Sequence, residues 1–490
     1  MTLDEVKEKV RQIWAIITGN TLDANITQFD QLIQDWWAIY RGNPEWLDYS
    51  YMSLSGSKQK RTRKSMGAAK IICSELAGLC FTEPPQLSTD KSVEQFLAEN
   101  NFWQKMTEYA EYGAALGGFA LKLYSNDGAL HIDYVSADCF VPISWDTSRV
   151  TEADFVSRIV RNTKKFLRIE HHRKITDGAF SGYEITTDYY FDTVGYPKAK
   201  AVDAGEEENI VRVATETPLF VYIKTPEANN KSLESPLGIS VYANAKDTLE
   251  SLDIAFDALQ HEIVMGKRRI IVPVSCVRSV VDPKTKKQVQ YFDPADETFI
   301  AFNNADAQEM QITDNTVEIR TESIKAAIQT LLSILSVQVG FSAGYLNFDG
   351  VSMKTATEVV SENSKPFKTK CAYENNIGNG ILQLLNAVRE IGAEYGIQTS
   401  AGEYTIAWND SIVEDRNTKA KYWIDRYNAG TCSLVRVLME LDGLSEADAQ
   451  KEAESIKSER ATVDVGSLFG GMDGASGTEN TDTGEAQDEA

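Results

Sequence analysis

The feature that most constrains this fold is a pair of helical patterns that flank a stretch of β pattern. Residues 246–268 are predicted to form an amphipathic helix, in which apolar residues recur at intervals of three and four, as in helices that pack side by side. These apolar residues are Leu249, Leu252, Phe256, Leu259 and Ile263. Helical spacing returns at residues 321–340, whereas residues 269–320 have the alternating pattern of short strands joined by turns. The chain is therefore predicted to leave a helical pair, form a small β module and return.

A row of carboxylates lies beside the apolar stripe of the first helix. Glu250, Asp253 and Asp257 follow helical spacing and share one side of it. In a monomer, the ordinary interpretation of such a row is a solvated acidic face.

The rest of the chain combines helices with antiparallel strands, which predicts the α+β class. Residues 119–124 and 129–134 alternate in hydropathy and flank Asn126-Asp127-Gly128, a turn that suits β-hairpins. Further strands are predicted at residues 155–160, 165–173, 182–191, 218–224 and 403–408. Residues 354–396 form a very long helical pattern, in which Lys365-Pro366 and two glycines, Gly378 and Gly380, are expected to cause kinks.

Both ends of the chain also carry local signals. Helices are predicted over residues 2–18, 26–40 and 64–81, and a smaller helical unit over residues 415–460. The densest basic run, residues 58–64, is interpreted either as a solvated helix start or as a contact with nucleic acid. Residues 461–490 contain no Lys or Arg and consist largely of small, polar and acidic residues, so this tail is predicted to be disordered.

The charge of the chain limits what it can bind. Its 490 residues include 49 basic and 72 acidic side chains, for a net charge of -23. Tight nucleic-acid binding relies on Lys and Arg that neutralise phosphates. The excess of acidic residues therefore argues against a protein that grips DNA, although it is compatible with DNA that slides past.

The sequence contains no pattern typical of a metal site or a membrane span. No CxxC pair occurs among the six cysteines, and no apolar run approaches the ~20 residues of a membrane span. The sequence predicts no metal, no cofactor and no membrane partner.

One motif suggests catalysis. Residues 340–344 match G-x-S-x-G, the nucleophile elbow of α/β hydrolases, which requires a strand before Ser342 and a histidine base after it. The four histidines all precede Ser342, so the match is interpreted as accidental. No phosphate-binding loop of the G-x-x-x-x-G-K-[ST] type is present either. We predict no catalytic residues; the alternative from this class is a hydrolase that uses acidic residues on a β scaffold.

Several segments resemble the portal proteins of tailed bacteriophages with Gram-positive hosts, most closely the listeriophage-type branch. Residues 66–85 resemble the family's early helix that ends in a double proline, and residues 233–242 resemble the approach to its stem. The most specific likeness runs from Phe348-Asp-Gly to residues 354–364, which resemble the family's channel loop and the start of its long kinked helix. The resemblance covers roughly residues 60–460.

The resemblance implies a portal fold with a wing, a helical stem, a β-containing clip inserted between the stem helices, and a helical crown. The implied segments are the wing at 1–245 and 354–412, the stem helices at 246–268 and 321–340, the clip at 269–320, the channel loop at 341–353 and the crown at 413–460. The tail at 461–490 matches no part of the family pattern.

The resemblance also implies a function: a ring, expected to have twelve subunits, at one capsid vertex of the virion, through which double-stranded DNA is packaged and ejected. In such a ring, Leu249, Leu252, Phe256, Leu259 and Ile263 would serve stem packing, and Glu250, Asp253 and Asp257 would face the lumen, where like charge keeps DNA mobile. The channel-loop residues expected near DNA are Asn347, Phe348, Asp349, Ser352 and Lys354. The clip residues expected to contact partners are Lys284, Lys286 and Lys287.

The partners implied are the terminase motor, the major capsid and scaffolding proteins, and the head–tail connector. Synthesis in the host cytoplasm is expected, because the amino terminus does not have the pattern of a signal peptide. The alternative within the structural class is another ring of the head–tail neck.

Overall fold

A computed structural model describes most of the chain, and within it two compact units can be distinguished. The described residues are 24–52, 56–147, 149–161, 164–191, 210–266, 270–273, 279–281, 288–290, 299–302, 313–314, 319–347, 356–400, 402–408, 416–444 and 448–458. The units are Met1–Asn409 and Asp410–Ala490. The predicted helix at 2–18 and the predicted tail at 461–490 lie outside the described residues.

The centre of the first unit is a three-stranded antiparallel sheet of order β11-β4-β5, covered by helices. Its strands are β4 (Gly118–Asn126), β5 (Ala129–Ser136) and β11 (Phe220–Lys224). The predicted hairpin between β4 and β5 is confirmed. Asp127 and Gly128 both have positive φ, at 49° and 77°, as the primed two-residue turns require.

A second antiparallel sheet has the order β10-β9-β8-β7-β6. Its strands are β6 (Phe140–Trp145), β7 (Val150–Arg161), β8 (Lys164–Asp177), β9 (Phe180–Phe191) and β10 (Ile210–Val213). Strands were predicted where β7, β8 and β9 lie, but β6 and β10 were not predicted. The two sheets are joined by a buried ion pair, in which Lys122 Nζ of β4 lies 2.6 Å from Glu170 Oε2 of β8.

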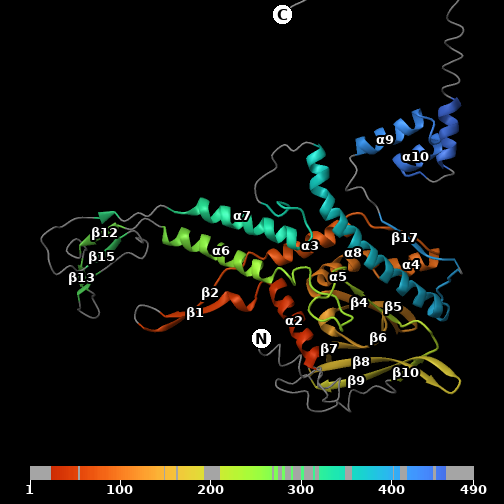
Figure 1. Ribbon diagram of the computed structural model, residues 1–490. Helices are drawn as coiled ribbons and strands as arrows, with labels where there is room; N and C mark the ends of the chain where they lie inside the picture. The colour runs from red at the N-terminus through yellow and green to blue at the C-terminus, as the bar shows by residue number, and fades with distance from the viewer. Residues whose placement is uncertain are drawn as a thin grey trace, which may run out of the picture. The chain divides into compact units, whose positions relative to one another are not determined.

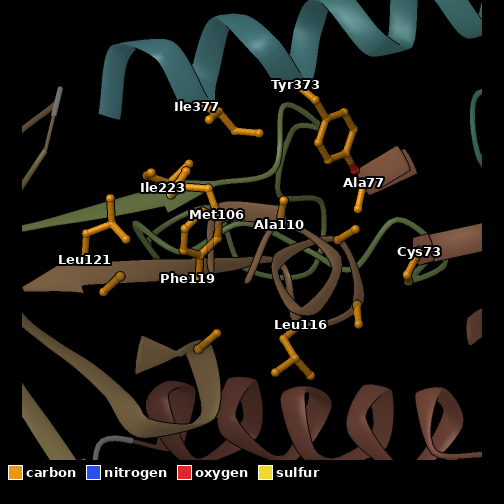
Figure 2. Close-up of a cluster of buried hydrophobic side chains, with 14 of the residues drawn as sticks. Cys73, Ala77, Met106, Ala110, Leu116, Phe119, Leu121, Ile223, Tyr373 and Ile377 are labelled. Carbon is orange, nitrogen blue, oxygen red and sulfur yellow. The ribbon is translucent and has the colours of Figure 1, made fainter. Parts of the chain in front are cut away.

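Helices α3 (Ala68–Phe81), α5 (Phe102–Leu116) and α8 (Ala356–Ile391) complete the main core. In Figure 2, Tyr373 and Ile377 of α8 lie on one side of Ile223, and Met106 and Phe119 lie on the other. The very long helix predicted for residues 354–396 is confirmed by α8, which contains Pro366.

Gly380 of α8 serves close packing. A Cβ at this glycine would stand 2.4 Å from Ile223 Cγ1, so only glycine lets the helix approach β11 this closely. Beyond α8, β17 (Thr405–Ala407) pairs with β3 (Gln86–Ser88), which confirms the strand predicted at 403–408.

The amino-terminal region contains one error of prediction. Helix α2 (Ala24–Tyr40) agrees with the helix predicted over residues 26–40, and α4 (Lys91–Glu99) precedes α5. The basic run, however, does not start a helix. Strand β2 (Lys58–Thr62) pairs with β1 (Asp48–Met52) in an antiparallel hairpin, and α3 begins only at Ala68.

Between helices α6 (Lys246–Met265) and α7 (Thr321–Gln338) the chain forms short strands. These strands are β12 (Ile270–Pro273), β13 (Ser279–Val281), β14 (Gln288–Gln290), β15 (Phe299–Phe302) and β16 (Thr313–Asp314). Strand β12 pairs in parallel with β15 and antiparallel with β16, while β13 and β14 form a separate hairpin. The β pattern predicted between the two helices is confirmed.

The second unit is helical where it is described. It contains α9 (Arg416–Asn428), α10 (Leu434–Asp442) and a helical stretch at residues 448–458. Ser433 caps α10, because its side-chain oxygen accepts a hydrogen bond from the backbone N–H of Arg436 at 3.3 Å.

Candidate functional site

The candidate site is the helical pair α6–α7 with the segments that hold it. The two helices pack against each other, although the β insertion separates them in sequence (Figure 1). Burial decreases along α6: Leu249 and Leu252 belong to the main core, Phe256 and Leu259 are half-buried, and Ile263 is 53% exposed. The predicted stripe therefore joins the core at one end and is partly uncovered at the other.

Helix α7 shows the same division between covered and uncovered apolar residues. Ile328, Leu332 and Leu335 are buried in the main core. Ile334 and Val337 are 46% and 47% exposed. The helical pair consequently presents apolar side chains that this chain alone leaves in contact with water.

Two aspartates of α6 form a buried anchor. Asp253 accepts hydrogen bonds from Trp46 Nε1 at 2.9 Å, Ser65 Oγ at 3.0 Å and the Met66 backbone N–H at 2.8 Å. One turn later, Asp257 accepts two hydrogen bonds from Arg61, at 2.9 and 3.1 Å. This anchor fastens the segment around the β1–β2 hairpin to α6.

The anchor corrects the prediction of an exposed acidic stripe. Asp253 and Asp257 are only 5% and 7% exposed, because residues far away in the sequence cover them. Glu250 alone of the three is not buried, and its side chain is partly exposed. Neither Trp46 nor Arg61 could be recognised as a partner from the sequence, in which residues 58–64 stand out only as a basic run.

At the other end of the pair, a clamp holds α6 to the start of α7. Arg320 donates from Nε and Nη2 to the two carboxylate oxygens of Glu262, each at 3.0 Å. These hydrogen bonds hold the pKa of the Glu262 carboxyl below its ordinary value. The Ile319 side chain also lies against Gly266, since a Cβ at Gly266 would stand 2.6 Å from Ile319 Cγ1. The two points where the chain enters and leaves the β insertion thus lie together.

After α7, the chain turns and packs against α8. Thr369 Oγ1 donates to the Gly340 carbonyl at 2.7 Å, and Lys365 Nζ donates to the Val337 carbonyl at 2.9 Å. Gly340 has φ +87°, which glycine adopts without strain. The buried Phe341 ring stacks on Tyr345 at 4.5 Å between centroids. The beginning of the predicted channel loop is therefore fixed by α8.

Several predicted site residues lie outside the described residues. Asn347 is described and exposed. The remaining predicted DNA-facing residues, Phe348, Asp349, Ser352 and Lys354, are not among the described residues. The same holds for the predicted clip contacts Lys284, Lys286 and Lys287.

The described residues form no recognisable catalytic centre around Ser342. The segment that precedes it is helix α7, whereas a nucleophile elbow requires a strand at that place. Within the described ranges, no three His, Cys, Asp or Glu residues lie close enough together to hold a metal ion. No helix in the described part of the chain is long and apolar enough to span a membrane.

Comparisons with known proteins point to one family. The model of the family "Phage portal protein, SPP1 Gp6-like" matches residues 24–465. A search of curated proteins gives no significant match.

Two solved structures show distant likeness. One is a chain of the virion of a native gene transfer agent particle, with TM-score 0.39, 10% identity, and coverage of 77% of this chain and 89% of that chain. The other is a chain of the neck of the native gene transfer agent particle, computed with C12 symmetry, with TM-score 0.34, 11% identity, and coverage of 76% and 88%. Because both scores are below 0.5, the family assignment rests on the sequence match.

Proposed function

This chain belongs to the SPP1 Gp6-like family of phage portal proteins, and we propose that identical copies of it close into a ring around a channel for double-stranded DNA. The observation that carries the proposal is the helical pair α6–α7, which lies side by side and carries a β insertion between its helices. This is the stem and clip arrangement that the family resemblance implies. The match over residues 24–465 includes all of these elements.

The exposed apolar residues of the helical pair support assembly. Ile263, Ile334 and Val337 are each about half exposed in the single chain. Completing the burial of such a side chain removes apolar surface from water at roughly 25 cal/mol per Å². Twelve copies, the number that the resemblance implies, would repeat this gain at every subunit contact.

The charge of the chain suits a conduit. A net charge of -23 per copy repels phosphate, so DNA inside the ring would move without being held. With Asp253 and Asp257 buried, Glu250 is the member of the predicted acidic row that is left partly exposed to face a lumen.

The remaining roles follow from the family resemblance. We propose that the β insertion, including Lys284, Lys286 and Lys287, docks the terminase motor and later the head–tail connector. Asn347, Phe348, Asp349, Ser352 and Lys354 would line the narrow part of the channel. The ring would sit at one vertex of the virion, among capsid and scaffolding proteins, after synthesis in the host cytoplasm. Its role is structural, with ATP hydrolysis left to the motor.

Electron microscopy of the purified full chain tests the proposal. We expect rings with a central hole, and twelvefold symmetry at the vertex of assembled particles. The Ile263→Asp variant should assemble poorly, whereas Ile263→Leu, which keeps an apolar side chain at the same 53% exposed position, should assemble normally. A chain that stays monomeric at every protein concentration, or that occurs in particles away from a DNA-filled vertex, would contradict the portal role.

A further inference from the structure

The β1–β2 hairpin is a two-stranded sheet to which no other described strand is added. Among its described residues, Tyr49 and Arg61 are half-buried and all the others are exposed. An isolated two-stranded hairpin is at best marginally stable in water, because it has no core of its own. Figure 1 shows the hairpin as a ribbon beside α6. The hairpin therefore requires contacts with another part of the chain, or with another molecule, to keep its conformation.

One face of the hairpin receives this support from α6, and the other does not. Tyr49 pairs with Arg61 across the strands, and Arg61 reaches Asp257 of α6. Because side chains alternate along a strand, Met52 and its cross-strand partner Lys58 belong to the opposite face. Both of these residues are exposed. The anchor thus fixes the direction of the hairpin while leaving one face uncovered.

The exposed side chains have the composition of a protein interface. Met52 is 67% exposed and Tyr51 is 48% exposed. Methionine and tyrosine are enriched where proteins contact one another. A surface that contacted only water or phosphate would not require the exposed apolar side chains of Met52 and Tyr51.

The charge of the hairpin identifies the partner. The hairpin, residues 48–62, contains three basic side chains and one acid, whereas the whole chain has a net charge of -23. A second copy of this chain therefore offers the hairpin a surface of opposite charge. The hairpin is also fastened to α6, a helix of the pair that the proposed function places at the subunit contacts of the ring.

We infer that the β1–β2 hairpin is an arm that packs against the next copy of this chain. The inference rests on the proposed ring. The exposed face, with Met52, Lys58 and Lys60, meets the acidic surface of the neighbour, and Tyr51, which lies on the other side of strand β1 but is also exposed, adds apolar contact. Each subunit would then hold its own hairpin through Arg61 and Asp257 and hold its neighbour through the opposite face.

The main competitor is a contact between the basic run and DNA. Lys58 and Lys60 would suit phosphate, but that contact leaves the exposure of Tyr51 and Met52 without a purpose. The two possibilities also respond differently to apolar substitutions. Replacing Met52 weakens a protein interface, whereas a phosphate contact depends on the lysines alone.

Assembly of designed variants tests the arm. We expect the Tyr51→Ser/Met52→Ser and Lys58→Glu/Lys60→Glu double variants each to raise the protein concentration at half-assembly by about tenfold or more. The matched controls are Met52→Leu and Lys58→Arg/Lys60→Arg, which keep the apolar or charged character and should assemble like the original chain. Ring fractions are measured by mass photometry, and thermal melting verifies that each variant is folded.

A crosslinking experiment gives a second, direct measurement. A photoreactive amino acid in place of Met52 should yield covalent dimers in assembled rings, with the adduct mapped to the neighbouring chain by mass spectrometry. Adducts found only within one chain, or normal assembly of both double variants, would overturn the arm. Rings that form normally in a lysine variant that fails to retain DNA would instead identify a DNA contact. If the unaltered chain forms no rings, the proposed function itself fails.

Discussion

The main core and the helical pair are stabilised in different ways. Around the β11-β4-β5 sheet, residues such as Leu121, Met106 and Ile381 are fully buried among apolar neighbours. Along α6 and α7, the burial of apolar side chains decreases with distance from the core. Polar contacts hold these helices instead: the buried aspartates nearer the core and the Glu262–Arg320 clamp at the far end. The core is complete within one chain, whereas the helical pair leaves apolar residues in water.

This difference separates the region that is stable within a single chain from the region whose apolar side chains we expect neighbouring subunits to cover. A substitution in the core should lower the stability of a single chain. A substitution on the uncovered side of the helical pair should leave the single chain almost unchanged and act on assembly. Four measurements, from the largest expected effect to the smallest, examine this contrast.

The largest effect is expected in the core. Leu121 of β4 has no exposed surface, and Leu121→Ala should lower the free energy of unfolding by about 2–5 kcal/mol, because it leaves a cavity. Denaturant unfolding of the monomer measures this change. Leu233→Ala, at a 94% exposed position, should change it by less than about 0.5 kcal/mol. Equal losses in the two variants would contradict the assignment of the core.

The next effect depends on pH and concerns the ion pair that joins the two sheets. Burial by itself would raise the pKa of Glu170, but its neighbours His172, Lys122 and Arg168 lower it to about 2, below the ordinary value of 4.5 for this carboxyl. A lowered pKa in the folded state stabilises the protein above the unfolded pKa, and this stabilisation is lost as the pH falls from about 4.5 to 2.

Glu170→Gln should therefore unfold more easily than the unaltered chain at pH 7, by on the order of 3 kcal/mol. The difference should narrow as the pH decreases through the window between the two pKa values. Denaturant unfolding at several pH values measures it. A difference that stays constant down to the lowest accessible pH would show that the charge of Glu170 contributes nothing.

A smaller effect is expected at the anchor of the helical pair. Asp253→Ala leaves Trp46 Nε1 and the Met66 N–H without their acceptor and should cost about 1–3 kcal/mol in the free energy of unfolding. Glu250→Ala is the matched control on the same helix, and a change within about 0.5 kcal/mol is expected there because Glu250 is partly exposed to solvent. If both variants behave alike, the anchor does not support α6.

The smallest effect on a single chain is expected on the uncovered side of α7. Ile334 is 46% exposed, and Ile334→Ser should change the stability of the monomer by no more than about 0.5 kcal/mol. The same variant should shift the equilibrium from rings to monomers, which sedimentation at several protein concentrations detects. A loss of monomer stability comparable to that of Leu121→Ala would remove the distinction between the two regions.

Elements defined by local periodicity could be predicted from the sequence. The spacing of Leu249, Leu252 and Phe256 predicted α6, and Asp127-Gly128 predicted the β4–β5 turn, because both signals depend on neighbouring residues. The long helix α8 was predicted for the same reason. The parts of the β1–β2 hairpin were visible only as a basic run, which fits a strand as well as the start of a helix.

Contacts between distant residues could not be predicted. Asp257 meets Arg61 across 196 residues of sequence, and Asp253 meets Trp46 across 207. A helical spacing shows which side chains share a face, but it does not show what covers that face. The acidic row was for this reason expected at an exposed surface, although two of its three members are buried.

The close approach of Gly266 to Ile319 has a consequence for how proteins of this kind can change. The β insertion begins and ends at almost the same place. Its length can therefore change without a change in the positions of helices α6 and α7. The entropy of closing a flexible loop grows only with the logarithm of its length, by about 0.6 kcal/mol for each doubling. An insertion of another size or sequence can therefore be exchanged at this junction while the helices on either side keep their places.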